Sequence, residues 1–286
     1  MMSEKPGAAQ VADPLTHRGR VHSIESFGTV DGPGCRMVVF TQGCPMRCAY
    51  CHNPDTWAYN AGTQVTVGEL IKKFNRNRPF YASGGITVSG GEPLMQADFV
   101  ADLFWAAHND PKGCIHTCLD SSGITFGKGS PSRQASIARL LDNCDLVLLD
   151  IKHSDPKGHY DLCLQPQEDP LAFGDELARR GIPVLIRHVS VPGITDQEEE
   201  LKGIGRIIAA WDNVVGLDVL PYHTMGLAKY LSMGLPNRLE GVPAMDPKRA
   251  PELRRIILKE RARVRAQRKQ QQAAQTSQGE ATDKRV

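Results

Sequence analysis

The sequence predicts an α/β protein built on a parallel sheet, and two features of the chain support this prediction. Short runs rich in Val, Ile and Leu alternate with longer amphipathic segments, as they do in repeated β/α units. The apolar runs show little polar alternation, which indicates strands buried on both faces. Right-handed crossovers would bring the carboxyl ends of such strands to one edge of the sheet, where the functional loops follow.

Six apolar runs are expected to be strands, and helices are expected in five of the intervals around them. The first helix should begin after Thr66, because Glu69 lies three residues further on and completes a capping box. The other helices show apolar residues at helical spacing. The expected strands are residues 36–41, 86–89, 115–119, 146–151, 184–188 and 215–220. The expected helices are residues 67–75, 97–108, 136–142, 171–180 and 197–210.

The chain of 286 residues is expected to form one main domain over residues 21–260, because no internal repeat or linker interrupts it. Residues 1–20 are expected to be flexible. Residues 261–286 are basic and rich in glutamine, and we expect them to form a disordered tail.

The charge and the composition exclude some classes of function. Residues 259–286 carry a net charge of +5, which leaves −3 for the rest of a chain whose total is +2. A nearly neutral body gives no reason to expect nucleic-acid binding. The first twenty residues contain no apolar run long enough for a signal peptide or a membrane span, so we expect a cytoplasmic protein without membrane contact. We also expect the protein to be a monomer.

Three cysteines, Cys44, Cys48 and Cys51, follow the first expected strand directly. A four-iron four-sulfur cluster normally takes four cysteine thiolates, so three would leave one iron with open coordination sites. Three other interpretations of these residues remain. Cys48 to His52 matches the C-x-x-C-H pattern of haem attachment, Cys3His is a possible zinc site, and Cys48 with Cys51 could form a redox dithiol.

Polar and glycine residues follow the later strands, at the edge where a ligand is expected to bind. Gly90, Gly91 and Glu92 follow the second strand, and a carboxylate beside flexible backbone suits an ammonium group. Helix capping or ordinary structural hydrogen bonding would also explain each residue taken alone. The remaining residues of this kind are Asp120, Ser121, Asp150, Lys152, Arg187 and His223.

The C-x3-C-x2-C spacing with Tyr50 before the last cysteine resembles the radical S-adenosylmethionine (SAM) superfamily. The resemblance implies that the open iron is chelated by the amino and carboxylate groups of SAM. It also implies that Tyr50 contacts the adenine, and that residues 90–92 bind the SAM amino group. The fold implied is a partial TIM barrel of about six β/α units with a lateral opening.

Longer segments resemble one branch of this superfamily, the enzymes that activate glycyl radical enzymes. Within that branch, the resemblance is to activases whose substrate is pyruvate formate-lyase. These segments include residues 25–34, 51–57, 116–120, 150–152, 191–193 and 220–223. The resemblance implies that SAM lies against Asn53, Glu92, Asp120, Asp150, Lys152 and His223. It implies that Arg187 contacts SAM or the substrate peptide. It also implies a monovalent cation (sodium or potassium) at Asp120 and Asp150, near the carbonyls of Ser121 and Leu148. Asp31 is implied to face the partner protein.

The implied activity is reductive cleavage of SAM to methionine and a 5′-deoxyadenosyl radical, which takes hydrogen from a glycine of the lyase. Flavodoxin or ferredoxin is the implied electron donor. One alternative is an activase of another glycyl radical enzyme, although many of these carry a cysteine-rich insertion and residues 52–85 contain no cysteine. A second alternative is a radical SAM enzyme that acts on a small molecule or a nucleobase. A third is a non-catalytic module that binds zinc or an iron–sulfur cluster.

Overall fold

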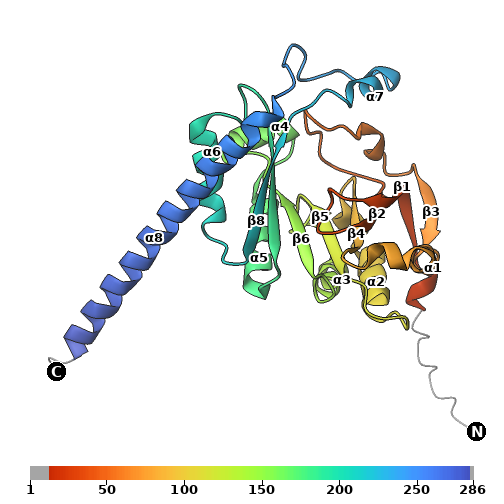
Figure 1. Ribbon diagram of the computed structural model, residues 1–286, viewed down its shortest axis with the longest axis horizontal. Coiled ribbons are helices and arrows are strands. Elements are labelled where there is room, and N and C mark those ends of the chain that lie inside the picture. Colours follow the sequence, from red (N-terminus) through yellow and green to blue (C-terminus); the bar gives the residue numbers. More distant parts are fainter. Residues whose placement is uncertain (1–12, 284–286) are drawn as a thin grey trace, which may run out of the picture.

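The computed structural model describes residues 13–283, so most of the N-terminal segment expected to be flexible, residues 1–12, lies outside the described residues. Over the described part, eight strands form one open sheet in the order β3-β1-β2-β4-β5-β6-β7-β8 (Figure 1). The predicted α/β class is confirmed, and the sheet does not close into a full barrel.

Six neighbouring strands run parallel and correspond to the six predicted from the sequence. They are β2 (Arg36–Thr41), β4 (Gly85–Gly90), β5 (Thr117–Ser121), β6 (Leu146–Asp150), β7 (Val184–Ser190) and β8 (Val214–Pro221). Two further strands were not predicted. β1 (Arg18–Gly28) pairs antiparallel with β2, and β3 (Thr63–Thr66) pairs antiparallel with β1.

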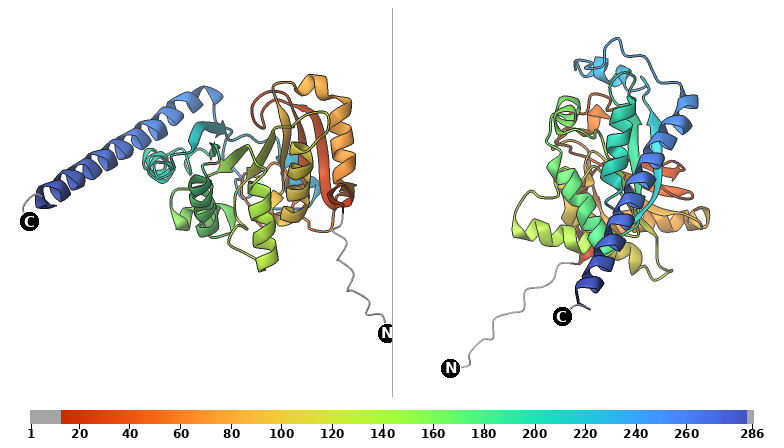
Figure 2. Two further views of the ribbon diagram at one scale, coloured as in Figure 1. Left: turned by 90° about the horizontal axis from the view of Figure 1, so that it is seen from below. Right: turned by 90° about the vertical axis from the view of Figure 1, so that its left-hand side faces the viewer.

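The helices lie mainly in the crossovers between the parallel strands (Figure 2). The predicted capping box of Thr66 and Glu69 is present at the start of α1. The helices are α1 (Val67–Arg76), α2 (Ala97–His108), α3 (Pro131–Leu141), α4 (Pro156–Cys163), α5 (Glu168–Arg180), α6 (Glu198–Ile208), α7 (Leu227–Ser232) and α8 (Ala250–Asp283). In the described part of the chain, no helix is both long and apolar enough to cross a membrane.

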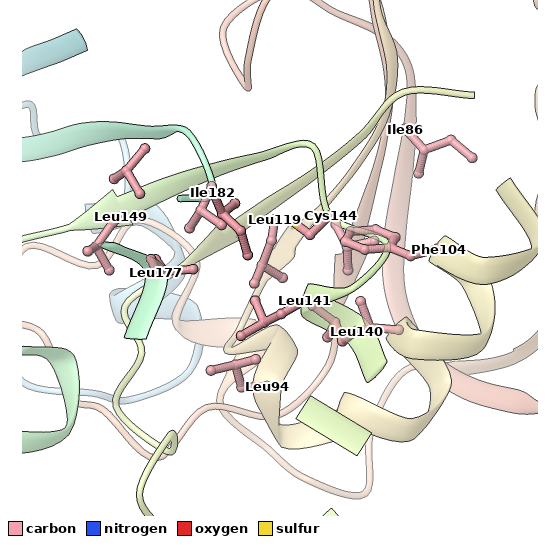
Figure 3. Packing of buried hydrophobic residues seen from close by; sticks show 14 of the residues in the cluster. Ile86, Leu94, Phe104, Leu119, Leu140, Leu141, Cys144, Leu149, Leu177 and Ile182 are labelled. Atoms are coloured by element: carbon pink, nitrogen blue, oxygen red, sulfur yellow. The ribbon is translucent and has the colours of Figure 1, made fainter. Parts of the chain in front are cut away.

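Successive strand residues face opposite sides of the sheet, and this alternation separates the core from the inner face. One set packs against the helices in the main hydrophobic cluster, part of which Figure 3 shows around Leu119, Leu149 and Phe104. The residues between them face the other side. On β5 this places Cys118 and Asp120 on the inner face, and Asp120 lines the cavity described below.

A buried arginine fixes the loop that connects β1 and β2. Arg36 is almost fully buried and donates hydrogen bonds to Thr87 Oγ1 at 2.6 Å, to the Ile86 carbonyl at 2.9 Å and to the Pro33 carbonyl at 3.1 Å. The Thr87 hydroxyl in turn donates to the Asp31 carbonyl at 2.7 Å. These bonds satisfy the guanidinium group, which would otherwise be costly to bury, and hold the Asp31–Gly34 turn against β4.

The C-terminal segment differs from the expected disordered tail, because α8 continues as a helix through Asp283 and extends well past the sheet (Figure 1). Arginines of its first half reach the end of α6. Arg261 donates to the carbonyls of Ile208, Trp211 and Val214, and Arg268 donates to the carbonyl of Ala209. The carbonyls of Ile208 and Ala209 lie at the C-terminus of α6, where carbonyls lack helical partners and favour cations, whereas Trp211 and Val214 follow this helix. Part of the basic run therefore has a structural role that composition did not indicate.

Replacing Arg261 with methionine should remove the hydrogen bonds to these three carbonyls while keeping much of the side-chain volume. We expect the free energy of unfolding to fall by about 1.5–3 kcal/mol, the usual range for hydrogen bonds that involve a charged group. Urea unfolding followed by circular dichroism measures this change. The control is Arg255→Met at an exposed position of the same helix, and equal stability of the two variants would contradict the assigned role.

Candidate functional site

Apart from Leu148, the sequence-predicted site residues line one cavity of about 700 Å³, and the strands β4, β5 and β6 end at it. Its lining contains the three motif cysteines and Asp31. It also contains Tyr50, Asn53, Gly90, Gly91, Glu92, Asp120, Ser121, Asp150, Lys152, Arg187 and His223. The structure thus brings together residues that are up to 192 positions apart in the chain, although their roles as ligands stay predictions.

The loop that carries the cysteines is held by its backbone. The Arg47 N–H donates to the Cys163 carbonyl and the Ala49 N–H donates to the Leu162 carbonyl, each at 2.9 Å. At the start of the loop, the Gly43 N–H donates to the Thr56 carbonyl at 2.8 Å. The loop is therefore anchored to the end of α4 on one side and to its own exit on the other.

The three motif cysteines are free thiols, and burial dominates the environment of two of them. Burial raises the pKa of the Cys44 thiol, and it raises the pKa of Cys51 to about 11. A hydrogen bond from Cys163 lowers the pKa of Cys48. No group of three His, Cys, Asp or Glu side chains in the described residues could hold a single metal ion. A four-iron cluster does not require the three thiols to meet at one ion, because each cysteine binds a different iron.

Sequence analysis gave no role to Cys163, yet its thiol contacts Cys48 directly. Cys163 is the last residue of α4, fully buried in the apolar cluster that also contains Cys44 and Met46. Its distance of 115 positions from Cys48 along the chain gave no signal of this contact. Cys163 therefore lies directly beside a motif cysteine.

Two glycines at the carboxyl end of β4 are required by close contact with β2 and with the start of the cysteine loop. Gly90 has φ +107°, and a Cβ there would lie 2.4 Å from the Thr41 nitrogen. A Cβ on Gly91 would lie 2.3 Å from the Gly43 carbonyl oxygen. Any larger residue would push these two segments apart. The glycines thus permit the close approach of backbone, and their contact with SAM stays a prediction.

The Glu92 carboxylate is fully engaged by its own chain. Oε1 accepts hydrogen bonds from Ser121 Oγ at 2.6 Å and from the Leu94 N–H at 3.0 Å. Oε2 accepts from Ser122 Oγ at 2.6 Å and from the Ser122 N–H at 3.1 Å. Burial raises the pKa of Glu92, and these bonds oppose that rise. The carboxylate thus fixes the turn after β5, a role that sequence analysis missed.

An ion-pair chain crosses the inner face of the sheet. Arg187 on β7 lies 3.1 Å from Asp120 Oδ2 and 3.7 Å from Asp31 Oδ1. Burial raises the pKa of both carboxyls, and the charge of Arg187 opposes this. Asp31 is only 8% exposed. Its side chain can therefore meet only a partner segment that enters the cavity.

A second ion pair lies beside the cysteine loop. Lys152 Nζ is 2.7 Å from Asp150 Oδ2 and 5.6 Å from the ring centre of Tyr50. Burial lowers the pKa of Lys152, but Asp150, Tyr50 and Cys48 together raise it well above its usual value, so the ammonium form is retained. The charge of Lys152 lowers the pKa of Cys48, and the charge of Asp150 opposes this. Lys152 therefore favours the thiolate form that iron binding needs.

Three buried polar atoms of the cavity lining have no hydrogen-bond partner within the described residues: Asp120 Oδ1, the Tyr50 hydroxyl and His223 Nδ1. Buried polar groups are nearly always paired, so unpaired ones facing a cavity indicate a ligand. The lining also has five carboxylates, from Glu25, Asp31, Glu92, Asp120 and Asp150, against three cationic groups, from Lys152, Arg187 and Lys229. The residues therefore fit a polar ligand that carries positive charge.

Replacing Glu92 with glutamine should destabilise the protein, because an amide has one acceptor oxygen and cannot keep all four hydrogen bonds. We expect the free energy of unfolding to fall by about 1–3 kcal/mol, the cost of leaving buried groups unpaired. Denaturant unfolding of the cluster-free protein tests this. The control Glu199→Gln changes an exposed carboxylate on α6, and a Glu92→Gln protein no less stable than this control would contradict the assignment.

Comparisons with known proteins identify the fold and the family. A family model described as a 4Fe-4S single cluster domain matches residues 30–164. A radical SAM methyltransferase from Sphaerobacter thermophilus is similar in structure, with a TM-score of 0.56 and 14% identity over 79% of this chain and 64% of that one. This similarity shows the radical SAM fold.

Curated relatives give the family. The pyruvate formate-lyase-activating enzyme of Staphylococcus epidermidis is 42% identical over 84% of this chain and 95% of its own length. The enzyme of the same name from Streptococcus mutans is 45% identical over 84% of this chain and 90% of its own length. Similarity of this degree over nearly the whole of both relatives means that the chain belongs to the family of pyruvate formate-lyase-activating enzymes.

Proposed function

We propose that this protein activates pyruvate formate-lyase as a radical SAM oxidoreductase, by generating a glycyl radical on the lyase. The observation that carries the proposal is the cavity in which three cysteines of one loop share a wall with unpaired buried polar groups. A four-iron four-sulfur cluster bound by Cys44, Cys48 and Cys51 would supply the electron that cleaves SAM to methionine and the 5′-deoxyadenosyl radical. This radical would take a hydrogen atom from a glycine of the lyase.

The chain's own residues would bind and orient SAM. Asp120 Oδ1 is buried and unpaired within the described residues, so it can accept a hydrogen bond from an ammonium or a hydroxyl group. Lys152 and Arg187 are paired with Asp150 and Asp120, and each can also donate a hydrogen bond to a carboxylate of the ligand. Tyr50 lines the cavity and is our candidate for contact with the adenine. The excess of carboxylates in the lining suits a ligand whose sulfonium and ammonium groups outweigh its one carboxylate. Orientation and exclusion of water are the protein's contribution.

The substrate would be a glycine-containing segment of the lyase that enters the cavity. Asp31 supports this view, because its mostly buried carboxylate borders the cavity beside Arg187. Asp120 and Asp150, with carbonyls near Ser121, are our candidates for a monovalent cation. Flavodoxin or ferredoxin is the proposed electron donor, and we propose a monomer that works in the cytoplasm without nucleic acid.

The test is to reconstitute the protein anaerobically with iron and sulfide, reduce it, and add SAM with pyruvate formate-lyase. We expect 5′-deoxyadenosine by chromatography and a glycyl radical on the lyase by electron paramagnetic resonance (EPR). Nucleoside without the lyase radical would refute this partner and favour another glycyl radical enzyme. Zinc in place of iron and sulfide in the purified protein would refute the enzyme proposal.

Serine at Cys44, Cys48 or Cys51 should abolish both products, because an alcohol is a much poorer ligand for cluster iron than a thiolate. Iron content, nucleoside yield and the EPR signal measure the effect. Cys114→Ser, at an exposed cysteine outside the motif, is the matched control and should leave all three close to the original protein. Full nucleoside yield from any of the three motif variants would contradict the cluster assignment.

A further inference from the structure

A lysine from the segment after β8 bonds to the exit of the cysteine loop. Lys229 of α7 donates to Asn53 Oδ1 at 2.8 Å, and its Nζ lies 3.0 Å from Asp55 Oδ1 and 2.9 Å from Asp55 Oδ2. Lys229 and Asn53 both line the cavity. The two residues are 176 positions apart, so this contact joins the first and last parts of the barrel.

Asp55 extends the contact to the other end of the sheet. Its Oδ2 lies 3.1 Å from Nε2 of His22, which belongs to β1. β1 is the second strand from one end of the open sheet, and α7 follows β8 at the other end. The chain His22–Asp55–Lys229 therefore bridges the open side of the barrel, where no strand pairing joins β8 to β1 or β3. Figure 1 shows α7 close to this side of the sheet.

The rest of α7 packs closely on the same loop. A Cβ on Gly226 would lie 2.7 Å from the Cα of His52, so the backbones are almost in contact. The rings of Tyr230 and Trp57 meet edge to face with centres 6.0 Å apart. These contacts hold the Lys229 backbone in place, and the ammonium group is thereby directed at Asn53 and Asp55.

The bond from Lys229 also determines how the Asn53 amide can bind a ligand. An amide side chain has one acceptor oxygen and one donor nitrogen group. The bond from Lys229 occupies one acceptor site of the oxygen and turns that end of the amide toward the lysine. The Nδ2 group is then the end of Asn53 that is offered to a ligand in the cavity. Such a group can only donate, so it fits an acceptor oxygen.

We propose that Lys229 is a positioning residue that fixes the Asn53 amide so that its Nδ2 donates to an acceptor oxygen of SAM, either a carboxylate or a ribose hydroxyl oxygen. This inference rests on the proposed function, because it takes SAM as the ligand. Asp55 holds the ammonium group from the other side, and His22 holds Asp55. The binding surface for SAM thus depends on a residue outside the three-cysteine motif and outside the loop that carries it.

The test compares Lys229→Met, which keeps the alkyl chain and removes the charge, with Lys229→Arg and with Lys202→Met. Lys202 is a matched control, because it also binds two side chains, the carboxylates of Glu198 and Glu199, but lies on α6 outside the cavity lining. For each reconstituted protein we would measure iron per chain, the Kd for SAM, and the KM and kcat of SAM cleavage.

Lys229→Met should raise the Kd and the KM for SAM about tenfold, a loss of about 1.4 kcal/mol in binding free energy. The kcat at saturating SAM and the iron content should stay close to those of the original protein, because binding is lost equally from the ground and transition states. Lys229→Arg should restore most of the affinity, since arginine can donate to the same oxygens, and Lys202→Met should have no effect.

An unchanged Kd in Lys229→Met would overturn the inference, and so would an equal rise in Lys202→Met. Loss of iron from Lys229→Met would also overturn it, because the lysine would then support the cluster loop as a whole. The proposed function fails in a different way: the original protein would bind and cleave SAM without forming a radical on the lyase. In that case the effect of Lys229 on the Kd would still be measurable.

Discussion

The site depends on one constraint: side chains alternate between the two faces of the sheet, and the parallel strands all end at the same edge. Each strand sends one set of residues to the helices and the other to the inner face. The residues near the strand ends on that inner face, such as Asp120 and Arg187, therefore meet around one cavity. The apolar residues between them, such as Leu119 and Leu149, form the core that holds the sheet. The same repeat thus provides stability and function.

Burial of charge in this cavity is balanced only in part. Arg187 neutralises Asp120 and borders Asp31, and Lys152 neutralises Asp150. Hydrogen bonds rather than charges compensate Glu92. Asp120 Oδ1 has no hydrogen-bond partner within the described residues, and Asp120 lines the cavity. A polar group that is costly to bury without a partner is thereby available to a ligand.

The sequence predicted the parts of the molecule that local pattern determines. The six parallel strands, the capping box at Thr66 and the position of the cysteine loop follow from apolar runs and short spacings. β1 was missed because its burial alternates irregularly and its partner strands fix it. The role of Arg261 and the contact of Cys163 depend on tertiary neighbours. Lys229 was missed for the same reason, since its partner Asn53 is 176 positions away.

The central claim is that the three motif cysteines leave an iron free to bind SAM inside this cavity. Electron–nuclear double resonance of the reduced, reconstituted protein with SAM labelled by ¹⁷O in its carboxylate tests this claim most directly. We expect a hyperfine coupling between ¹⁷O and the cluster that is large enough to require an iron–oxygen bond. This coupling should disappear when unlabelled SAM replaces the labelled cofactor. A fully formed cluster that binds SAM without any such coupling would contradict it.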